Sequence, residues 1–393
     1  MSALAASRFV LSISLVAASL VACGGGSQPQ ISPPNPMPAQ HRRSGQSAAE
    51  FVYVANVYSN NVSGYAVNAS DGSLTQLKGS PFATGYGPAG IAIDPTGKFA
   101  YVANNGGVSG KPGNVSAFAI NAHTGALTQV AGSPFGAGAN PIAVAIRPDG
   151  KFAYVVNYSS HNVSVFTINA KTGALQKVDV AQTGNDPTAL AIDPSGKFVY
   201  ESHTGFHPDF RSGHLDGYAI DGTAGSLKKI KRAGNATNLD PVSATIDASG
   251  KFLYVANYDG QSISAYEITA ATGALSAVQG SPFLTEIDPG AVAANPNLPV
   301  IYVAVDLGVA AYTVSSAGVL APVQGSPFEG GYEPDGMAVD LLGKFAFVSV
   351  TGQQSGVYAY VVDQSDGALT EVQGSPFSAG LNPAGIAVVT EPG

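Results

Sequence analysis

The chain has 393 residues, of which 48 are Gly and 26 are Pro, and only 11% carry a charge. This composition is typical of a protein built from strands and turns, and its many aromatic residues argue against disorder. The formal net charge of −8 excludes a nucleic-acid partner, which would require a basic surface.

The first 22 residues have the pattern of a secretory signal peptide. Arg8 is their only charged side chain, and the apolar run at 9–18 is too short to span a membrane. Residues 20–23 read LVAC, which resembles a bacterial lipobox and predicts a lipid on Cys23. The alternative is an ordinary cleaved signal with an incidental cysteine. We expect a secreted protein held at the bacterial cell envelope, in the periplasm or at the outer membrane, by this anchor alone.

Residues 23–50 are rich in Gly, Ser, Pro and Gln and show no apolar periodicity. Such a composition predicts a flexible tether between the anchor and the folded part. Cys23 is the only cysteine, so no disulfide forms within the chain.

The rest of the chain, residues 51–393, consists of a repeat of about 50 residues. One copy reads FxYVAN, NVSxYxI, xxTGxL, an outer strand, PxxxAI and DPxGK, which predicts four strands per unit. Four-stranded units of this length are typical of propeller blades, and seven of them close a ring. We therefore predict an all-β, seven-bladed β-propeller in which three N-terminal strands and one C-terminal strand complete one blade. The units begin at Phe51, Phe99, Phe152, Phe198, Phe252, Val300 and Phe345.

The string GSPF recurs five times, at 79–82, 132–135, 280–283, 325–328 and 374–377. We expect it to follow the outermost strand, where the chain leaves the rim for the axis. Its Phe would then fill the seam between neighbouring blades. The aspartates of the DPxG strings are interpreted as turn residues, because Asp, Pro and Gly occupy the preferred positions of a type I turn.

These repeats resemble the lactonase family of seven-bladed propellers, which includes propeller-type 6-phosphogluconolactonases and surface proteins with YVTN-type repeats. The resemblance covers about residues 51–390 and implies hydrolysis of a lactone ring, with a small-molecule lactone as substrate. Enzymes of the family typically carry Pro-Arg-His on an inner strand and Asn-Glu at the end of the next strand. Neither string occurs at these positions here, so the resemblance assigns no catalytic residue.

The fourth unit is where the repeat is most strongly altered, since YVAN is replaced by residues 200–203, YESH, and a long polar insertion follows. Its His and acidic groups could serve acid–base chemistry or bind a metal, although their spacing matches no strong metal signature. An exposed polar insertion without a function is the alternative. If the unit is catalytic, His203 or His207 would be the base and Arg211 would stabilise the oxyanion. The candidates are Glu201, His203, His207, Asp209, Arg211, His214 and Asp216.

A second feature is an acidic residue immediately before the inner-strand proline in four successive units. These residues are expected on the same face as the fourth-unit insertion, forming an acidic half-ring at one mouth of the channel. Such a half-ring could hold a divalent cation or a cationic ligand, although no cofactor is otherwise expected. The alternative is that each acid only completes a turn. The four are Asp186, Asp240, Asp288 and Glu333.

Two functions therefore remain open from the sequence. One is a lactone hydrolase with its chemistry in the fourth unit. The other is a non-catalytic envelope propeller that binds a ligand or a protein partner across one face. We expect a monomer in either case.

Overall fold

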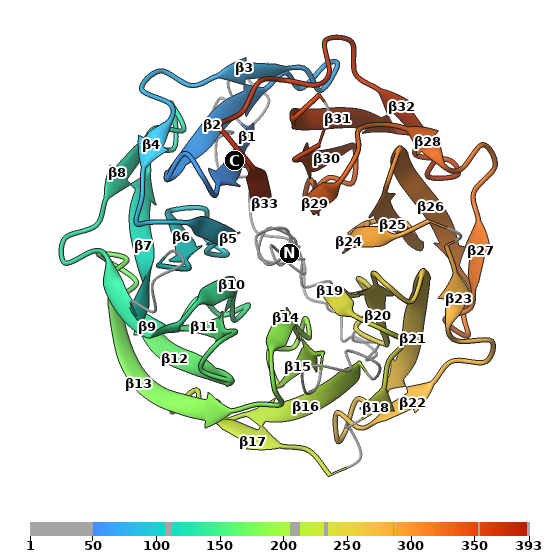
Figure 1. Ribbon diagram of the computed structural model, residues 1–393, viewed down its shortest axis with the longest axis horizontal. Coiled ribbons are helices and arrows are strands. Elements are labelled where there is room, and N and C mark those ends of the chain that lie inside the picture. Colours follow the sequence, from blue (N-terminus) through green and yellow to red (C-terminus); the bar gives the residue numbers. More distant parts are fainter. Residues whose placement is uncertain are drawn as a thin grey trace, which may run out of the picture.

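A computed structural model shows a ring of seven β-sheets around a central axis (Figure 1). It describes residues 50–106, 112–204, 213–231, 235–285, 287–352 and 354–390. These residues form strands and turns without an α-helix, which confirms the predicted all-β, seven-bladed propeller. None of them belongs to a helix long and apolar enough to cross a membrane. The predicted signal peptide, Cys23 and most of the tether lie outside the described residues.

Each blade contains four antiparallel strands from the axis outward, and blades are numbered here in the order of their second strands. The innermost strands of blades 1 to 7 each begin with a proline: β33 (Pro383–Thr390), β5 (Pro88–Ile93), β10 (Pro141–Ile146), β14 (Pro187–Ile192), β19 (Pro241–Ile246), β24 (Pro289–Ala294) and β29 (Pro334–Val339). The second strands are β1 (Glu50–Asn56), β6 (Phe99–Asn104), β11 (Phe152–Asn157), β15 (Phe198–His203), β20 (Phe252–Asn257), β25 (Val300–Val305) and β30 (Phe345–Val350).

The outer half of each blade consists of its third and fourth strands. The third strands are β2 (Asn61–Val67), β7 (Pro112–Ile120), β12 (Asn162–Ile168), β16 (His214–Ile220), β21 (Ser262–Ile268), β26 (Gly308–Val314) and β31 (Gly356–Val362). The fourth strands are β3 (Leu74–Gln76), β8 (Leu127–Gln129), β13 (Leu175–Gln182), β17 (Leu227–Lys229), β22 (Leu275–Ala277), β27 (Leu320–Pro322) and β32 (Leu369–Glu371).

The antiparallel pairing defines two faces of the ring. Innermost strands begin, second strands end and third strands begin on one face, called here the upper face, as the pairs Pro187↔His203 and His203↔His214 show. Loops between second and third strands and connections between blades therefore lie on the upper face, as predicted. The DPxG turns and Thr-Gly hairpins lie on the opposite, lower face.

The two ends of the described chain complete blade 1, as predicted. β33 pairs with β1 from Glu50↔Thr390 to Asn56↔Pro383, and the sheet order is β3-β2-β1-β33. This pairing leaves the ring without a free inner edge, because the N-terminal strands and the C-terminal strand protect each other.

GSPF follows the fourth strand, as predicted, but the chain does not leave the rim there. After β3 the chain bulges outward and then returns to the third strand, so that Phe82 pairs with Val62 in the short strand β4 (Phe82–Ala83). GSPF is therefore a bulge between two short segments, β3 and β4, that pair with the same third strand. The comparable short segments are β9 (Phe135–Ala139), β18 (Asn235–Ala236), β23 (Phe283–Leu284) and β28 (Phe328–Glu329).

The serine of GSPF supplies a hydrogen-bond acceptor where the backbone ladder between the third and outer strands is interrupted. Where the outer strand bulges away, Ser80 Oγ accepts the backbone N–H of Gly64 on the third strand at 2.9 Å. The serines of the other four copies make the same contact at 2.9–3.1 Å. The phenylalanines are half-buried against clusters that join two neighbouring blades, which confirms the predicted seam position.

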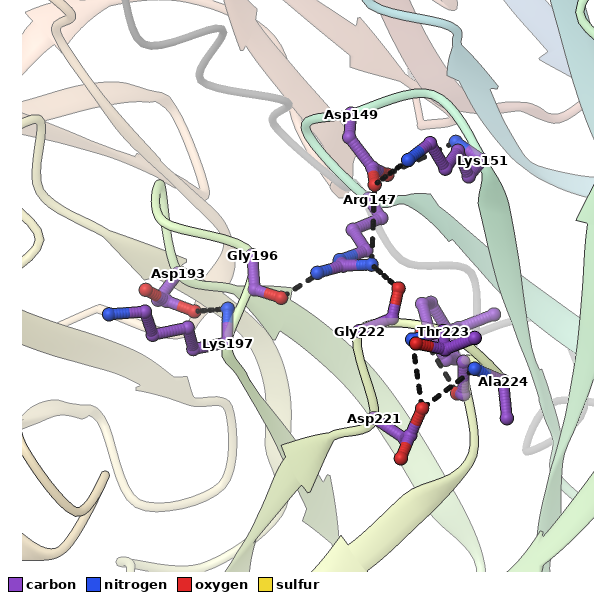
Figure 2. A network of polar contacts seen from close by, with 12 residues as sticks. Arg147, Asp149, Lys151, Asp193, Gly196, Lys197, Asp221, Gly222, Thr223 and Ala224 are labelled. Atoms are coloured by element: carbon purple, nitrogen blue, oxygen red, sulfur yellow. Dashed lines mark hydrogen bonds and ion pairs between the residues drawn. The ribbon is translucent and has the colours of Figure 1, made fainter.

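Turn aspartates on the lower face are structural, as predicted. Asp94 Oδ1 accepts the backbone N–H groups of Lys98 and Phe99. In the altered turn of blade 3, Arg147 instead reaches the next blade, where Nε donates to Gly196 O at 2.9 Å and Nη1 to Gly222 O at 3.1 Å (Figure 2). These groups are occupied in turn formation and blade packing.

Hydroxyl groups also join successive blades. In six blades a buried tyrosine on the second strand donates to a glycine carbonyl in the hairpin of the following blade, at 2.7–3.1 Å. Blade 7 has Phe347 at this position, so the seam between blades 7 and 1 lacks the bond. The donors are Tyr53, Tyr101, Tyr154, Tyr200, Tyr254 and Tyr302.

We expect Phe347→Tyr to raise the free energy of unfolding by about 1 kcal/mol, because it adds the seventh inter-blade hydrogen bond. Tyr154→Phe is the matched control and should lower it by about 1 kcal/mol by leaving the carbonyl of Gly225 without its partner. Urea unfolding of both variants measures the effect. Destabilisation by Phe347→Tyr would show that this seam is packed too tightly to admit the oxygen.

Glu50, on the lower face, is expected to make the free energy of unfolding depend on pH. Burial and the nearby charge of Asp340 raise the pKa of Glu50 to about 8, an increase that Lys344 only partly offsets. The folded state therefore retains a proton that the unfolded chain loses above about pH 4.5. The free energy of unfolding should fall as the pH rises from about 5 to about 8.

Urea unfolding midpoints at several pH values test this expectation. Glu50→Gln should remove the fall, because an amide does not titrate. Glu267→Gln, at an exposed position of β21, should leave it in place. An equal pH dependence in wild type and Glu50→Gln would refute the assignment.

Candidate functional site on the fourth blade

The candidate site lies where β15 and β16 meet at the upper face. In blades 1 to 3 this corner holds a neutral set of side chains. In blade 1, for example, Asn56 Nδ2 donates to Asn61 Oδ1 at 2.7 Å and to Ser63 Oγ at 2.9 Å. Blades 2 and 3 repeat both bonds. In blade 4 the same three positions are occupied by His203, His214 and Asp216.

Glu201 is the most unusual residue of this corner. The other six blades place a buried valine at its position, whereas the carboxyl group of Glu201 is 0% exposed. Neither of its oxygens has a hydrogen bond of normal geometry. Burial raises the pKa of Glu201 well above its ordinary value, and the charge of Asp216 adds to this. Lys229 and the backbone amide of Gly184 offset only part of the increase.

Strand pairing explains why these groups meet. Glu201 is directly opposite Asp216, and His203 is directly opposite His214, so all four side chains project from one face of the sheet. That face is turned toward blade 3, since the Tyr218 hydroxyl on the same strand donates to Gln182 O at the end of β13.

Asp216 is the anionic centre of the group. Its Oδ2 accepts from Lys229 Nζ at 2.6 Å and lies 3.6 Å from His203 Nε2. Burial acts to raise the pKa of Asp216, but hydrogen bonds from His203 and Lys229 outweigh it and hold the pKa below its usual value. Asp216 is therefore ionised at neutral pH.

The two imidazoles lie against each other. Their ring centroids are 5.4 Å apart and their planes 24° apart. Burial and the neighbouring His203 lower the pKa of His214, so its imidazole is neutral at neutral pH. His203 is 8% exposed, and its Nδ1 is buried without a hydrogen bond.

Gly184, in the connection between β13 and β14, covers the ring of His203. A Cβ at Gly184 would lie 2.2 Å from His203 Cε1 and 2.3 Å from Nδ1. Only glycine leaves room for the imidazole here. The connection thus closes one side of the cluster and fixes the ring position.

Glu201, His203 and Asp216 form a group of a size that suits a metal ion. One ligand atom from each lies within 4.8 Å of the others. It is the one such group found among the residues that the structure describes. The sequence spacing had indicated no metal site, because two of the three residues are brought together by strand pairing.

Three of the residues predicted for this unit, His207, Asp209 and Arg211, lie at 205–212, outside the described residues. Of the predicted residues of this unit, the structure brings together Glu201 and His203 on β15 with His214 and Asp216 on β16. Lys229 was missed by sequence reasoning. Lys229 lies on the outer strand β17, in a unit without GSPF, and no sequence pattern connects it with the acidic and His residues of β15 and β16.

The acidic half-ring is explained first by backbone conformation. Asp186, Asp240 and Glu333 have φ values of 52°, 52° and 54°, in the left-handed region that Gly, Asn and Asp adopt most readily. Asn140 and Asn382 have φ values of 54° and 56° at the same position in other blades. Ligand binding by these acids remains a prediction.

Side chains from the preceding blade contact acids of the half-ring. His161 Nδ1 accepts the backbone N–H of Asp186 at 2.9 Å and lies 3.5 Å from its Oδ1. Gln261 Nε2 donates to Asp288 Oδ1 at 2.9 Å. These contacts fix the blade connections of the upper face.

Asp335 is a further acid near this mouth that sequence reasoning missed. It is the second residue of β29, where the other inner strands carry no acid. Burial and the adjacent Glu333 raise the pKa of Asp335 well above its usual value, and Thr351 partly offsets this. The signal in the sequence was the acid of Pro334-Asp335-Gly336 among otherwise neutral strings.

These features define a seven-bladed β-propeller whose fourth blade carries a buried ionisable cluster. A family model described as lactonase, 7-bladed beta-propeller, matches residues 45–191 and 179–292. The chain therefore belongs to the lactonase family of seven-bladed propellers. No curated protein matches the chain.

Solved structures with the same fold include a candidate 6-phosphogluconolactonase from Bacteroides fragilis NCTC 9343. It has 22% sequence identity and a TM-score of 0.72, and the match covers 87% of this chain and 98% of that one. The periplasmic gluconolactonase of Pseudomonas aeruginosa has 18% identity and a TM-score of 0.71, with 87% and 100% covered. At these identities the likeness supports the fold alone.

Proposed function

We propose that this protein is a cell-envelope hydrolase that opens the ring of a lactone, with its chemistry on blade 4. One observation carries the proposal. At a corner where the repeat places Val, Asn and Ser, blade 4 has Glu201, His203 and Asp216. Perturbed ionisable groups of this kind gather at functional sites, and membership of the lactonase family supplies the reaction class.

Lactone hydrolysis requires a base that activates water and a group that stabilises the oxyanion at the carbonyl. His203 is the proposed base, and Asp216, 3.6 Å from its Nε2, would stabilise the imidazolium that forms. The neutral His214 beside it is a second proton acceptor. Arg211 is retained as the proposed oxyanion group.

Charge on the upper face favours a neutral substrate. The four acids of the half-ring lie at the inner ends of blades 4 to 7. A negative mouth repels a phosphorylated lactone and accepts a neutral one. We therefore propose a neutral sugar lactone, a class that includes the compound named for the Pseudomonas aeruginosa neighbour. That neighbour's periplasmic name also supports the proposed envelope location and the lipid anchor at Cys23.

The test compares hydrolysis of gluconolactone and its 6-phosphorylated form by the purified protein, followed as acid release. His203→Asn installs the residue that four other blades carry at this position, so it should fold normally. We expect it to lower kcat/KM for the neutral lactone by about 100-fold or more. His123→Asn, in an exposed turn, should leave hydrolysis unchanged. Unchanged hydrolysis by His203→Asn would place the chemistry elsewhere.

A second candidate function is a non-catalytic scaffold that binds a partner across the upper face. It is favoured by large apolar side chains exposed there, among them Tyr58 and Tyr86 at 61% each and Leu381 at 69%. Tyr58 N donates to Leu381 O at 3.2 Å, so two of them belong to adjacent loops. Absence of turnover across neutral, phosphorylated and aliphatic lactones would favour this function over hydrolysis.

A further inference from the structure

We propose that Glu201, His203 and Asp216 form a binding site for one divalent transition-metal ion, located between blades 3 and 4 at the upper face. Nothing in this inference depends on lactone hydrolysis, because ion binding is measured without a substrate. In the loaded protein His203 would be a ligand, and a water on the ion would be the activated nucleophile.

The spacing of the ligand atoms suits such an ion. His203 Nε2 and Asp216 Oδ2 are 3.6 Å apart. Two ligands at about 2.1 Å from a tetrahedral ion are separated by about 3.4 Å. Glu201 Oε completes the group within 4.8 Å. Small side-chain adjustments therefore bring all three atoms to bonding distance.

The placement of the two carboxylates provides the second argument. Glu201 and Asp216 are directly opposite each other in neighbouring strands, an arrangement in which like charges are destabilising. Glu201 is 0% exposed, and neither of its oxygens has a hydrogen bond of normal geometry. A divalent cation between the strands would compensate both carboxylates and satisfy the buried oxygens of Glu201.

Lys229 occupies the cation position only in part. Its Nζ contacts Asp216 Oδ2 at 2.6 Å, while no hydrogen bond joins it to Glu201. The Lys229 side chain is 61% exposed, so it can turn into solvent when an ion enters. The ammonium group shows that a positive charge is stable beside Asp216, and it competes with the ion for that oxygen.

The types of ligand atom in the group indicate which ion it would bind. One imidazole nitrogen and two carboxylates suit Zn²⁺ and related transition ions, with a fourth position left for water. Ca²⁺ takes six to eight oxygen ligands, and Mg²⁺ requires near-ideal octahedral oxygen geometry. Three protein ligands that include an imidazole fit neither. We therefore use Zn²⁺ as the probe.

Isothermal titration of the untagged, EDTA-treated protein with ZnCl₂ tests the proposal. We expect one equivalent to bind to the wild type. The variant Glu201→Val/His203→Asn/Asp216→Ser restores the residues of blades 1 and 3, so it should fold, and it should bind Zn²⁺ at least 100-fold more weakly. Thermal unfolding in EDTA verifies that the variant is folded.

Two further variants make the result specific. Asp259→Asn/Glu329→Gln/His123→Asn removes the same number of carboxylates and imidazoles from exposed positions of other blades, and it should bind Zn²⁺ like the wild type. Lys229→Gln should strengthen binding several-fold, because it removes the competing ammonium. The proposal is overturned if the wild type binds no Zn²⁺, if the blade 4 variant binds it equally well, or if Lys229→Gln weakens binding.

Discussion

Truncation of the chain after Asn382 is expected to unfold the whole ring. It removes β33, which supplies the innermost strand of blade 1 and pairs with β1 along its length. Ala384, Ile386, Ala387 and Val389 on this strand are all buried. Burial of such side chains contributes about 1.5–3 kcal/mol for each larger one, which together approaches the total stability of a typical domain, about 5–15 kcal/mol.

Circular dichroism and thermal unfolding measure the loss. Truncation after Thr390 is the matched control, because it leaves β33 intact, and it should unfold at the wild-type temperature. A synthetic peptide of residues 383–390 should partly restore the fold, since an added strand can pair with the exposed edge of β1. A cooperative transition at the wild-type temperature in the chain that ends at Asn382 would contradict the role of β33 in closing the ring.

The fold could be predicted because its information is local and repeated. The run of β-forming residues at 99–104 and the turn at 94–97 each specify a short element, and repetition specifies how the elements stack. The bulge at GSPF could not be predicted in this way. Its purpose depends on Ser80 reaching the N–H of Gly64, a contact that exists only once the strand register is fixed.

The site was predicted only in outline. A high density of His and acidic residues pointed to the fourth unit, but density does not show which side chains share a face. The register Glu201↔Asp216 decides that, and the length of the intervening loop hides it from any spacing motif. Lys229 was missed because it joins the cluster from another strand.

For the acidic half-ring, the sequence pattern suggested more than the structure requires. Asp186 and Glu333 formed a pattern that suggested binding, yet both stand where the backbone has positive φ. Asn at the same place in other blades satisfies the same conformation, so the pattern reflects the turn first. Asp335 projects from a strand rather than a turn, and backbone conformation does not account for it.

Glu201→Val is expected to stabilise the metal-free protein by about 1–4 kcal/mol. Replacing a buried ionisable group by an apolar residue of suitable shape is often stabilising, because the cost of removing the polar group from water disappears. Valine fits, since Val155 is fully buried at the same position of blade 3. Urea unfolding in EDTA measures the change.

Glu201→Gln is the matched comparison, because it keeps the shape and removes the titratable group. It should be less stabilising than valine, since the amide is still a buried polar group without partners. Destabilisation by Glu201→Val would mean that the carboxyl group supports the native packing. With Zn²⁺ present the wild type should be more stable than Glu201→Val, because an ion that binds only the folded wild type adds stability as its concentration exceeds Kd. A residue that costs stability without the ion and contributes stability with it is retained for binding, and this reversal connects the buried charge of blade 4 to its proposed ligand.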